Sequence, residues 1–471
     1  MDTRVSESDL RALLARSRAA WQQRPPGYAQ RMDDLARLRA AFQRRFDTLA
    51  QAMSADFGRR SLHESRLADQ MTVLHAIDHA RRHLRRWMRP RRMWADWPFL
   101  PARTEIQYRP LGVVGIIAPW NYPVNLALIP LAEALAAGNH ALIKPSELTP
   151  RTAVALAALI AEAFPPERVT VVPGDAAVGA AFAALPFDHL FFTGSTAVGR
   201  KVARAAAEQL TPVTLELGGK SPALVAPGYD LDTAAARIAQ GKLLNAGQTC
   251  IAPDYVLLPR GTREAFVAAL RAYVARHYPA LRETPDYSSI VSERHYARLA
   301  AMVAEARAAG ATVVTLPGED AHDAARRIFA PTLVLADPAQ PLALLREEIF
   351  GPVLPLLEYG TLEEALAIVR RNPQPLALYV FDGDRARVAR VLDAVPAGGV
   401  SVNDTVFHIA QARLPFGGIG TSGMGHYHGH AGFLTFSRPL PVFRQARWSS
   451  SALLRPPYGA LAERLLRLLT R

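Results

Sequence analysis

Cysteine and lysine are both scarce in this chain of 471 residues. The single cysteine, Cys250, excludes an intramolecular disulfide, so nothing indicates an oxidising compartment. The N-terminus lacks the apolar segment of a secretory signal. The longest apolar runs, such as LGVVGIIAPW at 111–120, are too short to span a membrane. We therefore expect a cytoplasmic protein.

The chain contains 51 arginines but only four lysines, which are Lys144, Lys201, Lys220 and Lys242. Arginine can replace lysine wherever a generic positive charge is enough, but a compact ammonium and a planar guanidinium differ in their contacts. All four lysines fall within 144–242, just before Cys250. We hypothesise that they mark positions where arginine does not suffice, and Lys→Arg kinetics at each position would test this.

A net charge of +13 raises the question of a nucleic-acid partner. The densest basic cluster is RRHLRRWMRPRR at 81–92, which also holds Leu84, Trp87 and Met88. This pattern predicts a helix with a basic, solvated face and a short apolar stripe. Aromatic and basic residues do not alternate elsewhere as they do in single-strand-binding proteins. We expect no nucleic-acid partner.

The order of apolar segments predicts the fold class. With 50% hydrophobic and 21% charged residues, the chain has the composition and length of two or three globular domains. The first 90 residues have helical spacing, and from 111 short apolar runs alternate with helical segments. A second such series follows Gly219 and continues to about 405. This alternation predicts an α/β fold of two doubly wound parallel lobes with a cleft between them.

Cys250 ends the segment NAGQTC, and its role decides whether the chain is an enzyme. A cysteine nucleophile needs access, a depressed pKa or a nearby base, and donors for an oxyanion. Gly247 allows a sharp backbone turn, and Pro253 limits a following helix. Cys250 is therefore expected on a bend facing a cleft. The alternative is a small buried filler of the core.

Three other positions bear on this chemistry. Glu216 ends an apolar strand, where burial would raise its pKa toward that of a general base, unless it is an edge charge paired with arginine. Asn121 follows a buried strand and could donate to an oxyanion, or cap the next helix. In FTGST, Gly194 permits close backbone approach and Ser195 is a candidate N-cap, so the helix N–H groups would face a phosphate.

Seven motifs together resemble those of the aldehyde dehydrogenase superfamily over nearly the whole chain. They are PWNYP (119–123), IKPSE (143–147), FTGST (192–196), ELGGKSP (216–222), NAGQTC (245–250), EEIFGP (347–352) and PFGG (415–418). TCIAPDYVL (249–257) and GHYHGHAGFLTFS (425–437) resemble the class 3 branch. DFGRRSLHE (56–64), the stretch at 81–92 and LPFDHLFFTGSTAVGR (185–200) are similar to bacterial coniferyl aldehyde dehydrogenases.

The resemblance implies a catalytic role for each matching residue. Cys250 would attack the aldehyde carbonyl, and the Asn121 amide with the Cys250 N–H would hold the oxyanion. Hydride transfer would leave a thioester, which water activated by Glu216 would hydrolyse. Family positions that bind the cofactor match these residues: Trp120, Lys144, Glu147, Gly194, Ser195, Glu348 and Phe350. No metal is implied.

Glu147 bears on the choice of cofactor. A carboxylate suits a free ribose 2′-hydroxyl and repels a 2′-phosphate. The resemblance also implies relatives that accept both cofactors. We therefore expect NAD, with NADP as an alternative.

The resemblance also implies a domain division and a homodimer. Residues 1–92 and 110–217 would form a Rossmann-like NAD-binding domain, and 218–413 the catalytic domain. Residues 93–109 and 426–450 would form a small β flap for dimerisation. The C-terminal tail, 451–471, has leucines on one helical face; it would pack on the same or a partner subunit, lie at a membrane surface, or fray.

Other interpretations remain open at this point. His426, His428 and His430 alternate, but no cysteine or acidic cluster accompanies them as metal ligands. Trp120, Tyr122 and Phe407 would form an aromatic substrate pocket, or belong to the core. The leading hypothesis is oxidation of an aromatic aldehyde such as coniferyl aldehyde, or of another apolar aldehyde, including fatty or medium-chain ones. A CoA-acylating dehydrogenase and an inactive binding scaffold are the alternatives; Glu216 argues against the first, and the intact catalytic set against the second.

Overall fold

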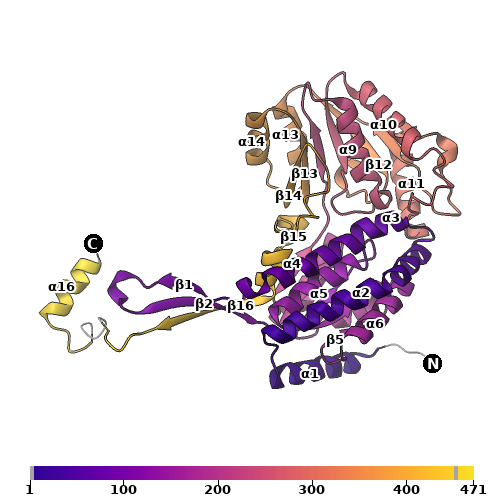
Figure 1. The fold of residues 1–471 in the computed structure, drawn as a ribbon. Coiled ribbons are helices and arrows are strands. Elements are labelled where there is room, and N and C mark those ends of the chain that lie inside the picture. The colour runs from indigo at the N-terminus through magenta and orange to yellow at the C-terminus, as the bar shows by residue number, and fades with distance from the viewer. Residues whose placement is uncertain (1–4, 450–454, 471) are drawn as a thin grey trace.

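The computed structural model describes residues 5–449 and 455–470, which form three sheets and their surrounding helices (Figure 1). Two mainly parallel sheets form the two lobes of the body. The third sheet is a narrow arm that projects from the body (Figure 1). The predicted α/β class with two doubly wound lobes is confirmed.

The first lobe has a six-stranded sheet in the order β15-β7-β6-β3-β4-β5. Its strands are β3 (Val113–Ile117), β4 (His140–Lys144), β5 (Val169–Val171), β6 (His189–Thr193), β7 (Val213–Glu216) and β15 (Gly423–Met424). Neighbours are parallel except β15 and β7. The central strands β3, β4 and β6 are buried along nearly their whole length, because helices cover both faces.

Alternate residues of β3 face opposite layers of helices, as the two-residue period of a strand requires. Val114 and Ile116 pack in a cluster with α2, α4 and α5, whereas Val113 packs in a second cluster with α1. The helices of this lobe are α1 (Glu7–Gln23), α2 (Tyr28–Phe57), α3 (Leu62–Ser65), α4 (Thr72–Trp87), α5 (Asn125–Ala137), α6 (Pro150–Ala163), α7 (Ala176–Ala183) and α8 (Thr196–Ala207), with a π-helix, η1, at Arg66–Met71. The expected helical character of the first 90 residues is confirmed.

The second lobe has a seven-stranded sheet in the order β10-β11-β12-β9-β8-β13-β14. Its strands are β8 (Pro222–Val225), β9 (Tyr255–Pro259), β10 (Thr312–Thr315), β11 (Thr332–Leu335), β12 (Val353–Tyr359), β13 (Ala377–Phe381) and β14 (Gly399–Val402). Only the edge pair β10–β11 is antiparallel. Its helices are α9 (Leu231–Leu243), α10 (Arg263–His277), α11 (Glu293–Ala308), α12 (Ala343–Arg346), α13 (Leu362–Arg370) and α14 (Arg385–Ala394).

The arm contains β1 (Arg91–Trp94), β2 (Arg103–Pro110) and β16 (Ser437–Arg444), all antiparallel. Between residues 426 and 436 the chain is still part of the body, because α15 (Gly429–Thr435) packs against α4 and α5. Beyond the arm, the tail contains α16 (Ala460–Leu469); residues 450–454 and 471 lie outside the described part. None of the described helices is long and apolar enough to cross a membrane.

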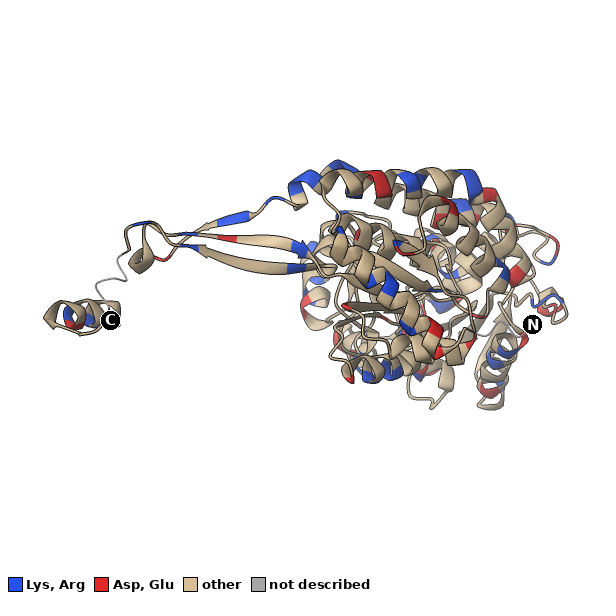
Figure 2. Ribbon diagram, turned by 90° about the horizontal axis from the view of Figure 1, so that it is seen from below, with Lys and Arg blue, Asp and Glu red and all other residues tan. Residues whose placement is uncertain are grey.

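The basic segment at 81–92 was only partly predicted. Leu84 and Trp87 are buried in α4 while Arg82, Arg85 and Arg86 are exposed, as expected, and Arg81 is half-buried. The helix ends at Trp87, however, and Arg91 and Arg92 belong to strand β1. Pro90 is the reason, because a proline disfavours helical backbone at the residue before it. On the side of the molecule seen in Figure 2, basic residues are interspersed with acidic ones along the outer helices.

Candidate active site

Two cavities meet at Cys250, one with a volume of about 270 Å³ and one of about 100 Å³. The larger cavity lies at the carboxyl ends of β3, β6 and β7, where ligands bind in sheets of this kind. Eight predicted site residues line it: Trp120, Asn121, Gly194, Ser195, Glu216, Cys250, Glu348 and Phe350. Lys144 and Glu147 do not.

The turn before Cys250 has an unusual backbone. After α9, Asn245 and Ala246 adopt φ values of 52° and 51°, and Gly247 has φ 74°. Left-handed backbone is unfavourable for residues with a Cβ and persists only where the surroundings hold it. Gly247 lies so close to Gly351 that a side chain there would overlap the Gly351 carbonyl group. The predicted sharp turn at Gly247 is therefore confirmed, and Cys250 is partly exposed beyond it.

Asn121 does not cap a helix. Helix α5 begins at Asn125, and Val124 occupies its N-cap position. The buried Asn121 side chain instead donates through Nδ2 to the Gln248 carbonyl oxygen at 3.1 Å. Asn121 is therefore tied to the loop that carries Cys250, and the capping alternative is wrong.

Glu216 is a buried carboxyl group without an arginine partner. It ends β7, which is not an edge strand because β15 pairs with it. Neither carboxyl oxygen has a hydrogen-bond partner among the described residues. Burial, and next the neighbouring Glu133, raise the pKa of Glu216 well above its ordinary value. The edge-charge interpretation is wrong, because β7 is not an edge strand and Glu216 has no arginine partner among the described residues.

The Cys250 thiol also has a raised pKa. Burial, followed by the carboxylates of Glu348 and Glu216, raises the pKa of Cys250 to about 12. The backbone N–H groups of Cys250 and Ile251 act in the opposite direction. Activation of this thiol therefore requires a base or a positive charge brought into the cleft, since the resting environment does not favour a thiolate.

The larger cavity is lined by groups that a nucleotide cofactor can contact: a helix N-terminus, aromatic rings and a carboxyl group. Ser195 is the N-cap of α8, as predicted, and its hydroxyl accepts from the Val198 N–H at 3.4 Å. Trp120 and Phe350 meet edge to face with ring centroids 5.3 Å apart. Glu348 is half-buried, its buried Oε1 has no partner among the described groups, and desolvation raises the pKa of Glu348 to about 8. An unpaired, buried carboxyl oxygen facing a cavity fits a ligand hydroxyl.

Lys144 and Glu147 lie together outside that cavity. Lys144 ends β4, is buried, and donates through Nζ to the Pro145 carbonyl oxygen at 2.7 Å. Its Nζ lies 3.8 Å from Glu147 Oε2, and the Glu147 side chain is 46% exposed. This pair offers an ammonium and a solvent-facing carboxylate at the edge of the same sheet. Of the other lysines, Lys220 and Lys242 are buried and Lys201 is exposed.

Sequence reasoning missed His295 and Arg298, which line the larger cavity from α11. Arg298 donates to the Glu348 carbonyl oxygen at 3.1 Å and also to that of Ile349. It thereby fixes the backbone that presents Glu348 and Phe350. The only local feature in the sequence is Ser292, a serine N-cap before the amphipathic helix α11. Such a cap does not indicate a functional site.

The smaller cavity is apolar. It is lined mainly by Leu67, Met71, Leu126, Ile129, Ile251, Val406, Phe407, Ile409 and Ala410, with Tyr122, Thr249 and His428 near Cys250. Tyr122 and Phe407 therefore share one pocket, as one of the two interpretations had it. Trp120 is not among its lining residues and contacts Phe350 and His295 instead.

The three alternating histidines do not face one another. His428 is buried and stacks on Phe416, whereas His430 stacks on Phe433 and contacts Trp87. Across residues 5–449 and 455–470, no group of three or more His, Cys, Asp or Glu side chains is placed to hold a metal ion.

Comparisons with known proteins show the family of this chain. The sequence profile described as "Aldehyde dehydrogenase family" matches residues 4–440. A "probable coniferyl aldehyde dehydrogenase" from Pseudomonas aeruginosa is 48% identical over 460 residues, which are 98% of this chain and 96% of that protein. The solved structure of Staphylococcus aureus AldH in a substrate-bound state has a TM-score of 0.92 at 36% identity, covering 98% of this chain and 99% of that one. A Mycobacterium tuberculosis aldehyde dehydrogenase complexed with NAD+ has a TM-score of 0.81 at 30% identity, with 94% and 90% of the two chains covered.

Proposed function

This chain belongs to the aldehyde dehydrogenase family and is an NAD(P)-dependent enzyme that oxidises aldehydes, and we propose that its substrates are aromatic or otherwise apolar aldehydes such as coniferyl aldehyde. One observation carries the proposal. Cys250 lines both an apolar pocket and a second cavity that also holds Glu216, Arg298 and Glu348, so an aldehyde and a cofactor can reach the same sulfur from two separate cavities.

The lining of the apolar pocket supports this substrate class. Aromatic and aliphatic side chains surround it, with Phe407 at 39% exposure and Met71 at 49% exposure facing outward. Such a pocket favours a planar or aliphatic apolar group and disfavours a charged one. A fatty or medium-chain aldehyde is the second candidate, since the same aliphatic lining suits it.

The reaction begins at the sulfur. Cys250 gives up its proton to solvent in the cleft, and the Sγ thiolate attacks the aldehyde carbonyl carbon. The carbonyl oxygen becomes an oxyanion held by Asn121 Nδ2 and the Cys250 N–H. NAD(P)+ held in the larger cavity would supply a positive charge near the sulfur and would accept the hydride whose loss leaves Cys250 as a thioester. Glu216 then accepts a proton from water, which attacks the thioester and releases the carboxylic acid.

The cofactor assignment favours NAD+ over NADP+. Gly194, Ser195, Glu348, Phe350 and Trp120 would hold the nicotinamide half, and Lys144 with Glu147 the adenine ribose. The exposed Glu147 carboxylate supports the preference, because it accepts from a free 2′-hydroxyl and repels a 2′-phosphate.

The arm supports a homodimer. The arm holds several large exposed apolar side chains, among them Trp94 in β1, Trp97 in the turn between β1 and β2, and Phe443 in β16, which a second subunit would cover. On this proposal residues 93–109 and that part of 426–450 which follows α15 form the dimerisation flap, and 1–92 with 110–217 the cofactor-binding domain. Residues 218–413 form the catalytic domain. The exposed leucines of α16 then pack on the partner subunit or lie at a membrane surface.

A substrate panel tests the proposal. NADH absorbance is followed with coniferyl aldehyde, benzaldehyde, and short and long aliphatic aldehydes at matched concentrations. We expect kcat/KM to be highest for the aromatic set, and a preference for long aliphatic aldehydes would favour the second candidate. Adding CoA should leave the rate unchanged, because Glu216 provides for hydrolysis; dependence on CoA would indicate an acylating enzyme.

A further inference from the structure

A buried ion pair lies directly behind the loop that carries Asn121. The side chains of Arg60 and Asp69 are both 0% exposed, and Arg60 Nη2 is 3.2 Å from Asp69 Oδ2. Arg60 Nη1 also donates to the Asn121 backbone carbonyl oxygen at 2.6 Å. Burying a guanidinium is costly unless its donors are used. Here one donor serves the pair and another fixes the residue proposed to bind the oxyanion.

Asp69 and Arg60 hold the same loop at further points. Asp69 Oδ1 accepts from the Asn125 N–H at 3.0 Å, at the start of α5. The Arg60 guanidinium carbon lies 4.9 Å from the centre of the Tyr122 ring, a cation–π contact. The Tyr122 hydroxyl is 2.7 Å from Thr249 Oγ1. The loop from 121 to 125 is therefore gripped at its backbone and through an aromatic ring.

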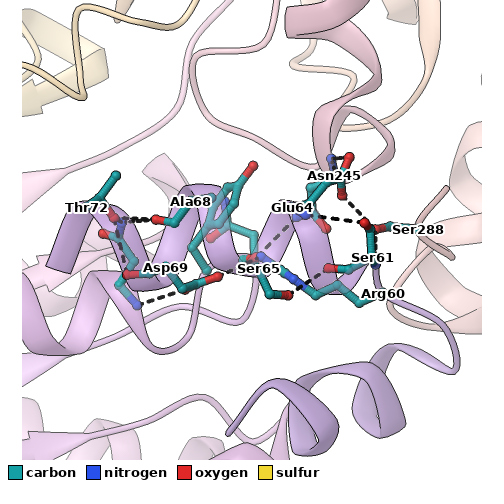
Figure 3. A network of polar contacts seen from close by, with 12 residues as sticks. Arg60, Ser61, Glu64, Ser65, Ala68, Asp69, Thr72, Asn245 and Ser288 are labelled. Atoms are coloured by element: carbon teal, nitrogen blue, oxygen red, sulfur yellow. Dashed lines mark hydrogen bonds and ion pairs between the residues drawn. The ribbon is translucent and has the colours of Figure 1, made fainter. Parts of the chain in front are cut away.

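The same N-terminal segment holds the turn before Cys250 (Figure 3). Both Glu64 carboxylate oxygens accept from the Asn245 N–H at 3.1 Å, and Ser288 Oγ donates to Glu64 at 2.9 Å. Asn245 Nδ2 donates to the Asn121 carbonyl oxygen at 3.1 Å and to that of Gln248 at 3.2 Å. These contacts hold Asn245 in its left-handed conformation.

The Asn121 carbonyl oxygen is thus the point where the two loops meet. It accepts from Arg60 and from Asn245, while the Asn121 side chain donates to Gln248. If Arg60 is lost, the peptide of Asn121 loses its stronger, charged donor. The amide that faces the oxyanion can then rotate away from Cys250.

We propose that Arg60 is a positioning residue for the oxyanion site: by holding the Asn121 carbonyl it sets the Asn121 amide relative to Cys250. The inference rests on the proposed roles of Asn121 and Cys250. Arg60 touches neither substrate nor cofactor, because it lines neither cavity. Its effect should therefore fall on the step in which negative charge develops on the substrate oxygen.

The test uses a double substitution and a matched control. Arg60→Met with Asp69→Asn removes the donor to Asn121 without leaving a buried, unpaired carboxylate, and residue 69 can still accept from the Asn125 N–H. The control is Arg168→Met with Asp34→Asn, which removes another buried Arg–Asp pair of the same lobe, away from both cavities. Arg60→Lys is a further variant, since a single ammonium keeps the charge beside Asp69 but lacks the fork geometry.

Stopped-flow measurement of the first NADH turnover reports acyl-enzyme formation. We expect the burst rate constant to fall by about tenfold to a hundredfold in the Arg60/Asp69 variant, as for a misplaced or missing oxyanion donor. Arg60→Lys should show a smaller fall of the same step, and the Arg168/Asp34 control should retain the wild-type rate. NAD+ affinity, measured by fluorescence quenching, should be unchanged in all three.

A double-mutant cycle with Asn121→Ala decides whether Arg60 acts through Asn121. In that background, adding the Arg60/Asp69 change should lower the burst rate by less than about threefold, because coupled residues are not additive. An additive loss, or a wild-type burst rate in Arg60→Lys and the double variant, would overturn the inference. Full activity of Asn121→Ala alone would instead overturn the proposed function, so the two failures are distinguishable.

Discussion

Replacing Gly247 by alanine tests whether the turn before Cys250 sets the position of the sulfur. Gly247 has φ +74°, and a Cβ there would lie 2.5 Å from the Gly351 carbonyl carbon and 3.0 Å from the Lys242 carbonyl oxygen. Both neighbours are backbone atoms, so no side-chain rotation can relieve the overlap. Gly261 is the matched control, because its φ is +81° and nothing lies within 4 Å of a Cβ.

The two substitutions separate the cost of the backbone conformation from that of the overlap. Gly261→Ala should lower the free energy of unfolding by about 1–2 kcal/mol, the cost of a left-handed residue with a Cβ. Gly247→Ala should lose that amount and a further ~1–3 kcal/mol, typical of overpacking. If the loop shifts by about 1 Å to relieve the overlap, kcat should fall roughly a hundredfold.

Urea unfolding gives the stability difference, and NADH production gives kcat. Because Cys250 is the only cysteine, its alkylation by iodoacetamide reports directly on the position of the sulfur. We expect Gly261→Ala to keep the wild-type kcat and alkylation rate. Equal behaviour of the two variants in stability, kcat and alkylation would refute the reasoning.

Three further predictions follow from the site. Cys250→Ser should abolish NADH production but keep NAD+ binding, whereas Glu216→Gln should accumulate an acyl-enzyme visible as an added mass; steady turnover in either variant contradicts the mechanism. The pKa of Cys250 is raised to about 12, so the thiolate fraction, and with it alkylation of the cofactor-free enzyme, should rise about tenfold per pH unit from pH 7 to 10; a plateau below pH 9 would argue against this environment. Glu147→Gln should reduce the ratio of kcat/KM for NAD+ to that for NADP+ by about tenfold, because the repulsion of the 2′-phosphate is removed, and an unchanged ratio would count against the role of Glu147.

Sequence patterns anticipated those parts of the site that depend on local order. Glu216 ends the strand β7, Cys250 follows the turn at 245–247, and both line the larger cavity. Gly247 was expected at a sharp turn, and its φ of +74° agrees. The predicted helix at 81–92 was too long. Its apolar stripe continues past the point where Pro90 ends the helical backbone.

Long-range contacts were beyond such reasoning. Glu64 meets Asn245 across 181 residues, and Arg60 meets Asn121 across 61. The segment DFGRRSLHE does not by itself show which of its charged residues is buried, or which residues that side chain contacts. Arg298 likewise reaches the backbone of Glu348 from a helix that looks ordinary in sequence.

The sequence by itself determined the fold class, the two lobes and the identity of the reactive cysteine. Hydrophobic periodicity, glycine positions and motif spacing predict these features because they act on the nearby backbone. Tertiary structure alone decided that Glu216 has no arginine partner, that Asn121 faces Gln248 rather than capping α5, and that Arg60 lies behind it. The physical reason is that burial and pairing of a charge depend on which distant segments pack around it, and local sequence carries no record of those neighbours.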